Sequence, residues 1–147
     1  MPQPFAFRPA TSRDFDFCWP IYRDAMQPLT AGWQEAAERR LVTDAMGDAG
    51  TSIVRAPGAE GAEGDAGWLQ VGETRYVIHL AHLYLVPAMR NRGLGTAFLR
   101  WMCDRAERKR KELTLDVMAS NPARALYERL KFRAFETAGP RIKMRWM

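Results

Sequence analysis

The sequence predicts an α/β (α+β) fold in which a mixed β-sheet is flanked by helices. Two observations carry this prediction. Two β-type runs, at 52–55 and 68–71, flank a glycine-rich stretch and predict a hairpin. In the second half, a strand, a helix, a strand and a further helix follow one another, which predicts a parallel crossover unit. The chain has 147 residues, a length that fits one domain, 1–147.

The first half is expected to contain one short strand and two helices before the hairpin. The strand is expected at 5–8, and Ser12 is the predicted cap of the helix that follows. A second helix is expected over 33–46, ending near Gly47. Residues 56–67 are predicted to be a flexible, acidic connection within the hairpin. The first helix carries large side chains at helical spacing: Phe15, Cys18, Trp19 and Tyr22.

The second half begins with a long β-type run over 75–86, which Pro87 ends. The apolar stripe Leu94, Ala97, Phe98 and Trp101 predicts a helix that reaches about Lys111. A strand at 113–117, a helix at 122–130 and a closing strand at 142–146 are expected to complete the fold.

Composition excludes several classes of protein. Apolar residues make up 47% and charged residues 27% of the chain, which is typical of globular proteins and excludes a disordered chain. No run approaches the roughly 18–20 apolar residues that a membrane span needs, and residues 1–5 lack the features of a signal peptide. Cys18 and Cys103 lie far apart without metal-ligand spacing, so we expect reduced thiols, a cytoplasmic setting and no metal.

Charge is distributed unevenly along the chain. Residues 1–87 hold seven basic and eleven acidic side chains, a net charge of −4, whereas residues 88–147 hold fifteen and six, a net charge of +9. This asymmetry predicts that the second half meets an anionic ligand, either nucleic acid or a phosphorylated cofactor.

One segment predicts a phosphate site. A strand stops at Pro87, and Gly93 and Gly95 then open an amphipathic helix. The first backbone N–H groups of a helix have no intrahelical partner and, together with the helix dipole, receive phosphate. The glycines let a diphosphate approach the backbone, and Arg90 and Arg92 add positive charge.

Other phosphate loops fit this segment poorly. A dinucleotide-binding loop requires a third glycine where this chain has Phe98, and a Walker loop requires Gly-Lys-Ser/Thr, which is absent.

The segment resembles the Gcn5-related N-acetyltransferase (GNAT) family, whose Q/R-x-x-G-x-G/A loop holds the pyrophosphate of acetyl-coenzyme A. The loop here is Arg90-Asn-Arg-Gly-Leu-Gly95, a complete match. Residues 121–132 are similar to the family's N-x-x-A-x-x-L-Y-x-x-x-G-F ending, and the opening at 7–16 is similar to the family's usual start. Lys131 departs from the pattern by replacing the glycine before Phe132, which is expected to alter the turn there.

The resemblance implies a mixed, mostly antiparallel twisted sheet with helices on both faces. Its central strands, 75–86 and 113–119, would splay to admit the cofactor. The strand before the loop would pair its backbone with the pantetheine arm of acetyl-CoA. The span from Asn121 to Tyr127 is one residue shorter than in many members, so either Ser120 or Asn121 would contact that arm. The implied cofactor-binding residues are Leu83, Tyr84, Leu85, Arg90, Asn91, Arg92, Gly93, Leu94, Gly95, Thr96 and Asn121.

The implied reaction is direct transfer of acetyl from the thioester to an amine. A base must remove a proton from the amine, a backbone N–H of the strand ending at Leu85 would stabilise the oxyanion, and the leaving thiolate gains from protonation. Tyr127 matches the family's acid, and Asp116 matches a carboxylate that is the base in some members. Glu73 and His82 are alternative bases.

The sequence therefore predicts an acetyl-CoA-dependent N-acetyltransferase acting on a small-molecule or peptide amine. The acidic half of the chain, residues 1–87, is expected to form the side of the site that binds the acceptor amine and to favour cationic amines. Neither a membrane nor nucleic acid is an expected partner, and the resemblance allows a homodimer. The alternatives are a non-catalytic acyl-CoA-binding module and a basic nucleic-acid-binding domain that uses the run 105–111. The acidic side chains expected on the acceptor side include Asp14, Asp16, Asp24 and Glu35.

Overall fold

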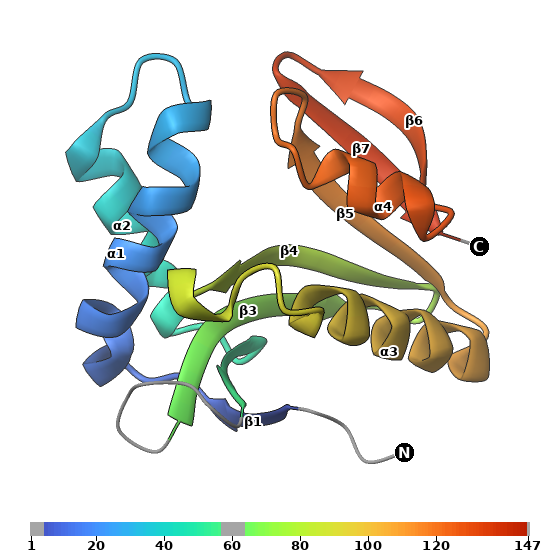
Figure 1. The fold of residues 1–147 in the computed structure, drawn as a ribbon, viewed down its shortest axis with the longest axis horizontal. Helices are drawn as coiled ribbons and strands as arrows, with labels where there is room; N and C mark the ends of the chain where they lie inside the picture. The colour runs from blue at the N-terminus through green and yellow to red at the C-terminus, as the bar shows by residue number, and fades with distance from the viewer. Residues whose placement is uncertain (1–4, 57–63, 147) are drawn as a thin grey trace. The chain divides into compact units, whose positions relative to one another are not determined.

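The computed structural model describes residues 5–56 and 64–146 and contains a seven-stranded open sheet with four helices (Figure 1). The strand order is β1-β2-β3-β4-β5-β7-β6. The pair β4–β5 is parallel, whereas β1–β2, β2–β3, β5–β7 and β6–β7 are antiparallel, so the predicted mixed and mostly antiparallel sheet is confirmed. The strands are β1 (Ala6–Pro9), β2 (Thr51–Arg55), β3 (Asp65–Glu73), β4 (Val77–Leu85), β5 (Glu112–Met118), β6 (Arg133–Ala138) and β7 (Arg141–Trp146), and the helices are α1 (Phe15–Met26), α2 (Glu35–Met46), α3 (Leu94–Lys109) and α4 (Arg124–Arg129).

The chain forms two compact units that share strands. Unit 1 comprises Met1–Gln70 and His82–Gly95, and unit 2 comprises Val71–Ala81 and Thr96–Met147. Strands β3 and β4 each contribute residues to both units, because the boundaries fall inside them.

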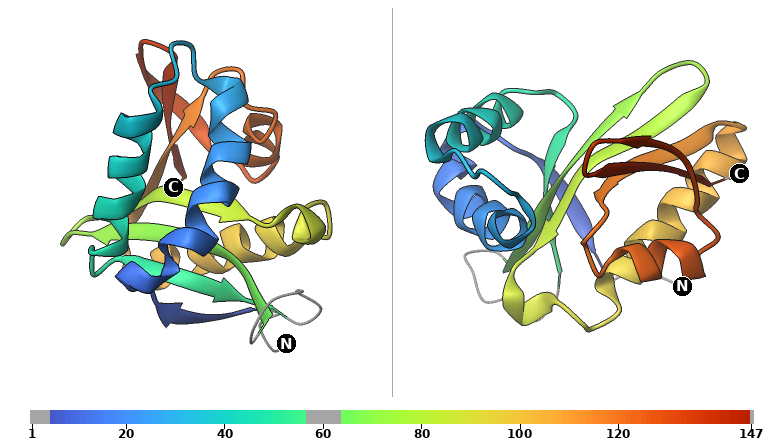
Figure 2. Two further views of the ribbon diagram at one scale, coloured as in Figure 1. Left: turned by 90° about the vertical axis from the view of Figure 1, so that its left-hand side faces the viewer. Right: turned by 90° about the horizontal axis from the view of Figure 1, so that it is seen from above.

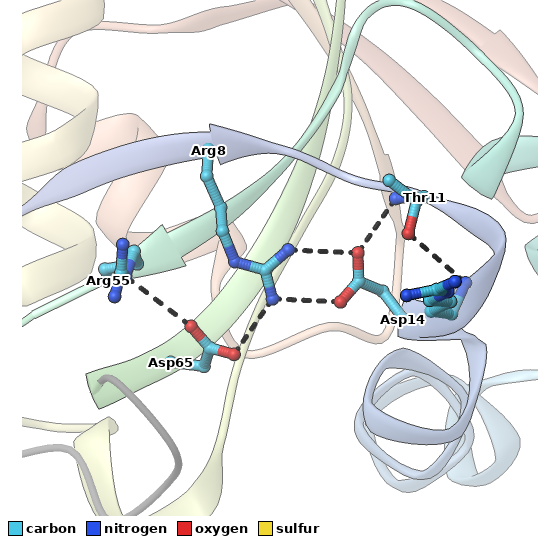
Figure 3. Close-up of polar contacts among 6 residues, drawn as sticks. Arg8, Thr11, Asp14, Arg55 and Asp65 are labelled. Atoms are coloured by element: carbon cyan, nitrogen blue, oxygen red, sulfur yellow. Dashed lines mark hydrogen bonds and ion pairs between the residues drawn. The ribbon is translucent and has the colours of Figure 1, made fainter.

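Unit 1 begins with an ion-pair network beneath the start of α1 (Figure 3). The Arg8 guanidinium donates two hydrogen bonds to Asp14, at 3.1 and 2.9 Å, and a third to Asp65, at 3.0 Å. Thr11 rather than Ser12 caps the first helical turn, because the Thr11 hydroxyl accepts from the Arg13 amide and Asp14 accepts from the Thr11 amide. The predicted cap was therefore wrong by one residue. The reciprocal pair is a capping box, which fixes where the helix begins.

Helices α1 and α2 are neighbours in unit 1, as both views of Figure 2 show. The predicted helix over 33–46 begins two residues later, at Glu35. Aromatic rings form the core here: Trp68 is fully buried, and its indole Nε1 donates to the Cys18 carbonyl at 3.2 Å. Tyr22, 2% exposed, donates its hydroxyl to Glu38 at 2.7 Å.

The predicted hairpin is confirmed as the antiparallel pair β2–β3. Of the connection predicted at 56–67, residues 57–63 lie outside the described residues. Gly67 is a position where only glycine fits, because a Cβ there would lie 2.1 Å from the Tyr84 carbonyl oxygen. This close approach brings β3 against the last residues of β4.

The predicted parallel crossover is present, and its β4–β5 ladder lies in unit 2. β4 leads through the loop to α3 and on to β5, and the β4–β5 ladder runs from Val77–Glu112 to Leu80–Leu115. The ladder ends before either strand does, which agrees with the expected separation of the central strands. The alternate residues Leu113 and Leu115 are 0% and 2% exposed and form the apolar face of β5.

The structure adds one strand that the sequence did not indicate. β6 pairs with β7 as the last hairpin, seen in red in Figure 2. Every residue of β6 is exposed, so the strand has no alternation of apolar and polar residues for a sequence reading to detect. No helix in the described ranges is long and apolar enough to cross a membrane.

Candidate active site

The predicted phosphate loop lies between β4 and α3 (Figure 1). After Pro87 the chain forms a 3-10 turn (η4, Pro87–Met89), in which the Met89 amide donates to the Val86 carbonyl and the Arg90 amide to that of Pro87. Asn91 and Gly93 then adopt left-handed backbone, with φ of 60° and 80°. These two reversals take the chain from the turn to the first residue of α3.

The surface of this loop is open at both glycines. A Cβ built on Gly93 or on Gly95 meets no atom of the described structure within 4 Å. The first amides of α3 have no carbonyl one turn earlier to bind, so they are available to a ligand. Open glycine backbone at a helix N-terminus suits a diphosphate, and the residues present therefore fit coenzyme A at this loop.

Arg90 ties the loop to the end of β4. Its Nε donates to the Leu85 carbonyl at 2.9 Å, and its Nη2 is buried with no hydrogen-bond partner in the described part of the chain. A buried guanidinium N–H without a partner is costly unless a ligand accepts from it. Arg92 is exposed, and its Nη1 lies 3.5 Å from the Met89 sulfur.

The backbone of 83–85, predicted to pair with the pantetheine arm, belongs to β4. The Leu85 carbonyl already accepts from Arg90, and the next amide, of Val86, donates to the Ala66 carbonyl at 2.8 Å. The Tyr84 hydroxyl and Nδ1 of His82 lie 2.7 Å apart on the same strand. The end of β4 is thus bound to β3 through the Val86 amide and to the loop through the Arg90 side chain.

Asn121 organises the start of α4 in unit 2. Its Oδ1 accepts from the Ala123 amide at 2.9 Å and forms a local turn just before α4, whose own N-cap is Ala123, while Ser120 is exposed. The helix proper begins at Arg124, two residues after the predicted start at Pro122. The side-chain amide nitrogen of Asn121 is left for another partner.

Tyr127 projects from α4. Its ring centroid lies 6.0 Å from that of Phe132, edge on. Although the residue as a whole is only half-buried, desolvation raises the pKa of Tyr127 above its usual value. The phenol therefore stays protonated at neutral pH, as a proton donor must.

The turn after α4 has a lysine, Lys131, where the family pattern has a glycine. Lys131 itself adopts φ of 78°, the left-handed region that glycine favours. The amides of Leu130 and Phe132 both donate to the Tyr127 carbonyl, at 3.1 and 3.0 Å. Lys131 thus adopts a backbone conformation that is strained for a residue with a side chain, and the expected change of the turn relative to the family stays a prediction.

Asp116 lies on the polar face of β5, one residue beyond the last pair of the β4–β5 ladder. Its side chain is 28% exposed, its Oδ2 lies 3.8 Å from Nε2 of His79, and its Oδ1 is buried without a hydrogen-bond partner in the described chain. The contact of His79 with this carboxylate could not be predicted from the sequence, because it depends on the register of the parallel pair.

The alternative base Glu73 is unsuited to the task. Lys109 donates to its Oε2 at 2.8 Å and Lys111 at 2.5 Å, and these hydrogen bonds lower the pKa of Glu73 to about 2. Such a carboxylate binds protons poorly. The same contacts show that two lysines of the basic run 105–111 hold β3 to the end of α3 within unit 2.

The acidic residues expected on the acceptor side behave differently from one another. Asp14 is 8% exposed and bound to Arg8, so its inclusion in that set was wrong. Asp16 and Asp24 are exposed, and the exposed Glu35 accepts from the Trp33 indole at 3.0 Å. Within 5–56 and 64–146, no group of three or more His, Cys, Asp or Glu side chains has the arrangement of a metal site.

Comparison with known proteins identifies the family and the fold. The sequence model of the Acetyltransferase (GNAT) family matches residues 18–132. No curated protein gave a significant match.

Solved structures of acetyltransferases share the fold. PaiA N-acetyltransferase from Thermoplasma acidophilum, in complex with coenzyme A, has a TM-score of 0.70 at 15% identity, over 96% of this chain and 97% of that one. The ribosomal-protein-S18-alanine N-acetyltransferase from Escherichia coli has a TM-score of 0.66 at 21% identity, over 96% and 92%. NAA60 from Arabidopsis thaliana, in complex with a bisubstrate analogue, has a TM-score of 0.65 at 18% identity, over 97% of both chains. With its loop, its sheet and the family match in agreement, the chain belongs to the GNAT family of acetyltransferases.

Proposed function

We propose that this protein is an acetyl-CoA-dependent N-acetyltransferase that works as one domain over residues 1–147. It moves acetyl from the thioester of acetyl-CoA directly to a primary amine while both substrates are bound. The observation that carries this proposal is the loop 90–95, whose glycines leave open backbone at the N-terminus of α3. The family match over 18–132 supports it.

The proposed cofactor contacts follow from the loop. Asn91 through Thr96 cradle the pyrophosphate, and Arg92 adds positive charge. The buried Nη2 of Arg90, which has no partner in the described chain, donates to a phosphate oxygen. The backbone of 83–85 and the amide nitrogen of Asn121 bind the pantetheine arm.

The chemistry requires three proton transfers. Asp116 takes a proton from the ammonium form of the acceptor, and the neutral amine then attacks the thioester carbonyl. A backbone N–H near Leu85 stabilises the oxyanion. As the C–S bond breaks, Tyr127 gives its proton to the departing sulfur and regains one from the attacking nitrogen through water. Holding the two substrates together supplies much of the acceleration.

The proposed acceptors are small or peptide amines with positive charge. The exposed carboxylates of Asp16 and Asp24 on α1, with Glu35 on α2, favour cationic molecules near unit 1. Similar structures come from an enzyme named for an alanine of ribosomal protein S18 and from one solved with a bisubstrate analogue, so both peptide and small amines belong in the trial panel. A cytoplasmic location agrees with two buried free thiols.

The test has a binding stage and a turnover stage. Calorimetry with coenzyme A should show saturable binding, and a panel of polyamines, lysine peptides, N-terminal peptides and acidic amines should reveal thiol release with at least one cationic member. Binding without turnover on any amine would instead indicate a non-catalytic acyl-CoA-binding module. Equal or faster rates with acidic acceptors would contradict the predicted charge preference.

A further inference from the structure

The strongest unassigned feature is the contact of His79 with Asp116 in unit 2. His79 on β4 is the register partner of Thr114 on β5, and its Nδ1 lies 2.7 Å from the Thr114 hydroxyl oxygen. This hydrogen bond orients the ring so that Nε2 lies 3.8 Å from Oδ2 of Asp116. The imidazole is therefore aimed at the carboxylate that lies just beyond the end of the parallel ladder.

The charged neighbours on β7 have other partners. Lys143 is the register partner of Asp116, but its ammonium binds Glu136 at 3.2 Å. Arg145 is the register partner of Thr114, and its guanidinium lies 3.7 Å from Glu112 and over the Phe135 ring. Neither cation is bound to Asp116, which leaves His79 as the proton-accepting group aimed at it.

On the other side of β4 lies β3, and the turn between the two strands is closed by the Thr74 amide, which donates to the Val77 carbonyl. Gly72 lies on β3 shortly before this turn. A Cβ built on Gly72 would meet nothing within 4 Å in the described structure. The His79 side chain is 39% exposed, so water reaches the ring.

We propose that His79 is a positioning residue and proton relay for Asp116, an inference that rests on the N-acetyltransferase function proposed above. His79 holds Oδ2 in place, and the buried Oδ1 of Asp116, which has no partner in the described chain, is the oxygen left to take the proton of the acceptor amine. Imidazole suits this role because it can accept a proton at one ring nitrogen and release one from the other.

The proton balance of the relay is simple. The substrate ammonium loses one proton to the Asp116 carboxylate and becomes the attacking amine. Asp116 passes a proton to Nε2 of His79, either directly after a small movement or through one water, and is again a carboxylate. The imidazolium then releases a proton to solvent from its exposed edge. No bond other than those to hydrogen changes, and no further reactant is needed.

The test compares pH profiles of kcat for His79→Gln, Thr114→Val and the exposed control Arg133→Gln on β6. His79→Gln should lower kcat about tenfold or more at neutral pH. As the pH is raised, the kcat of His79→Gln should keep rising at values where the kcat of the wild type is already constant. Without the imidazole, the proton on Asp116 must be removed by hydroxide or buffer in solution. The KM for acetyl-CoA should be unchanged. Thr114→Val removes the hydroxyl that orients the His79 ring, so its kcat should lie between those of the wild type and His79→Gln. The kcat of Arg133→Gln should equal that of the wild type.

A second measurement separates a relay from a structural role. Added imidazole should restore part of the rate of His79→Ala but have no effect on Asp116→Asn, which lacks the group that the relay serves. Melting temperatures confirm that each variant is folded. Two outcomes with an active wild type would overturn the relay alone. In the first, the pH profile of His79→Gln is the same as that of the wild type; in the second, imidazole does not restore the rate of His79→Ala. A wild type that acetylates no amine would overturn the proposed function as well.

Discussion

The guanidinium of Arg8 and the carboxylate of Asp14 form a two-point hydrogen-bonded ion pair that joins β1 to the first turn before α1 (Figure 3). Such paired bonds have the strongest geometry available to a protein ion pair. The Asp14 side chain is 11% exposed and that of Arg8 29%, so removing one partner would leave the other charge partly buried.

We predict that Asp14→Asn destabilises the protein by about 2–3 kcal/mol, less than the loss for a fully buried pair because Arg8 keeps some contact with water. The exposed neighbour Asp16 provides the control, since Asp16→Asn should change stability by no more than about 0.5 kcal/mol. Urea unfolding of both variants measures the difference. Equal stabilities would show that the pair contributes nothing.

The same pair predicts a dependence of stability on acid. Burial on its own would raise the pKa of Asp14, but the hydrogen bonds from Arg8 and the Thr11 amide outweigh it and hold the pKa below the usual value. The stabilisation is therefore present above about pH 4, the region of an unfolded aspartate, and is lost as the pH falls through the folded value. The gap in unfolding free energy between wild type and Asp14→Asn should shrink below about pH 4. A gap that stays constant down to pH 2 would contradict this.

The phosphate loop allows a sharp comparison between two glycines. Gly93 and Gly32 both have left-handed backbone, with φ of 80° and 68°, and a Cβ on either meets nothing within 4 Å in the described structure. Alanine at each should therefore cost a similar amount of stability, on the order of 1 kcal/mol.

Only Gly93→Ala should weaken coenzyme A binding, because only there would the methyl group occupy the approach to the loop backbone. We expect the affinity measured by calorimetry to fall at least tenfold for Gly93→Ala and to stay within twofold of wild type for Gly32→Ala. An equal loss in both would indicate that the effect comes from folding rather than from the loop.

The elements with clear periodicity could be predicted from the sequence, and those fixed by tertiary contacts could not. The crossover from β4 through α3 to β5 has strong apolar patterns and was placed to within a few residues. β6 was missed, since an exposed strand at the sheet edge has no apolar face to detect.

The candidate site divides in the same way. Arg90 to Gly95 could be found because a phosphate loop is local, so its residues are neighbours in the chain. The burial of Asp14 against Arg8 and the contact of His79 with Asp116 depend on which strand pairs with which, and on the register of each pair. Sequence alone specifies neither, so Asp14 was placed on the acceptor side and His79 was overlooked.

Lys131 provides a prediction about strain. Its φ of 78° costs an L-residue about 1–2 kcal/mol, which glycine avoids at the expense of about 0.5–1 kcal/mol of chain entropy. We expect Lys131→Gly to raise the unfolding free energy by about 0.5–1 kcal/mol, visible as a higher melting temperature. Lys131→Ala keeps the strain and should show no such gain. Similar gains from both would mean that the lysine side chain, rather than its backbone, is unfavourable.

The two cysteine thiols should not react with a thiol reagent in the folded protein. Cys18 and Cys103 are buried, and desolvation raises their pKa values to about 12 and about 11. Because the thiolate is the reactive form, a thiol reagent should label neither in native buffer and both in denaturant. This can be checked by absorbance with and without guanidinium. Rapid native labelling would show that one of them is accessible.

Tyr127 should affect turnover and not binding. Burial raises the pKa of its phenol, so the group is protonated throughout the neutral range and can protonate the departing thiolate. We expect Tyr127→Phe to lower kcat roughly 10²-fold or more, with the KM for acetyl-CoA within about twofold of wild type, because the ring and its packing on Phe132 remain. Tyr76→Phe, at an exposed tyrosine, is the control and should be fully active. The assay monitors free coenzyme A with the acceptor found in the panel. An unchanged kcat for Tyr127→Phe would show that water, and not Tyr127, protonates the departing thiolate.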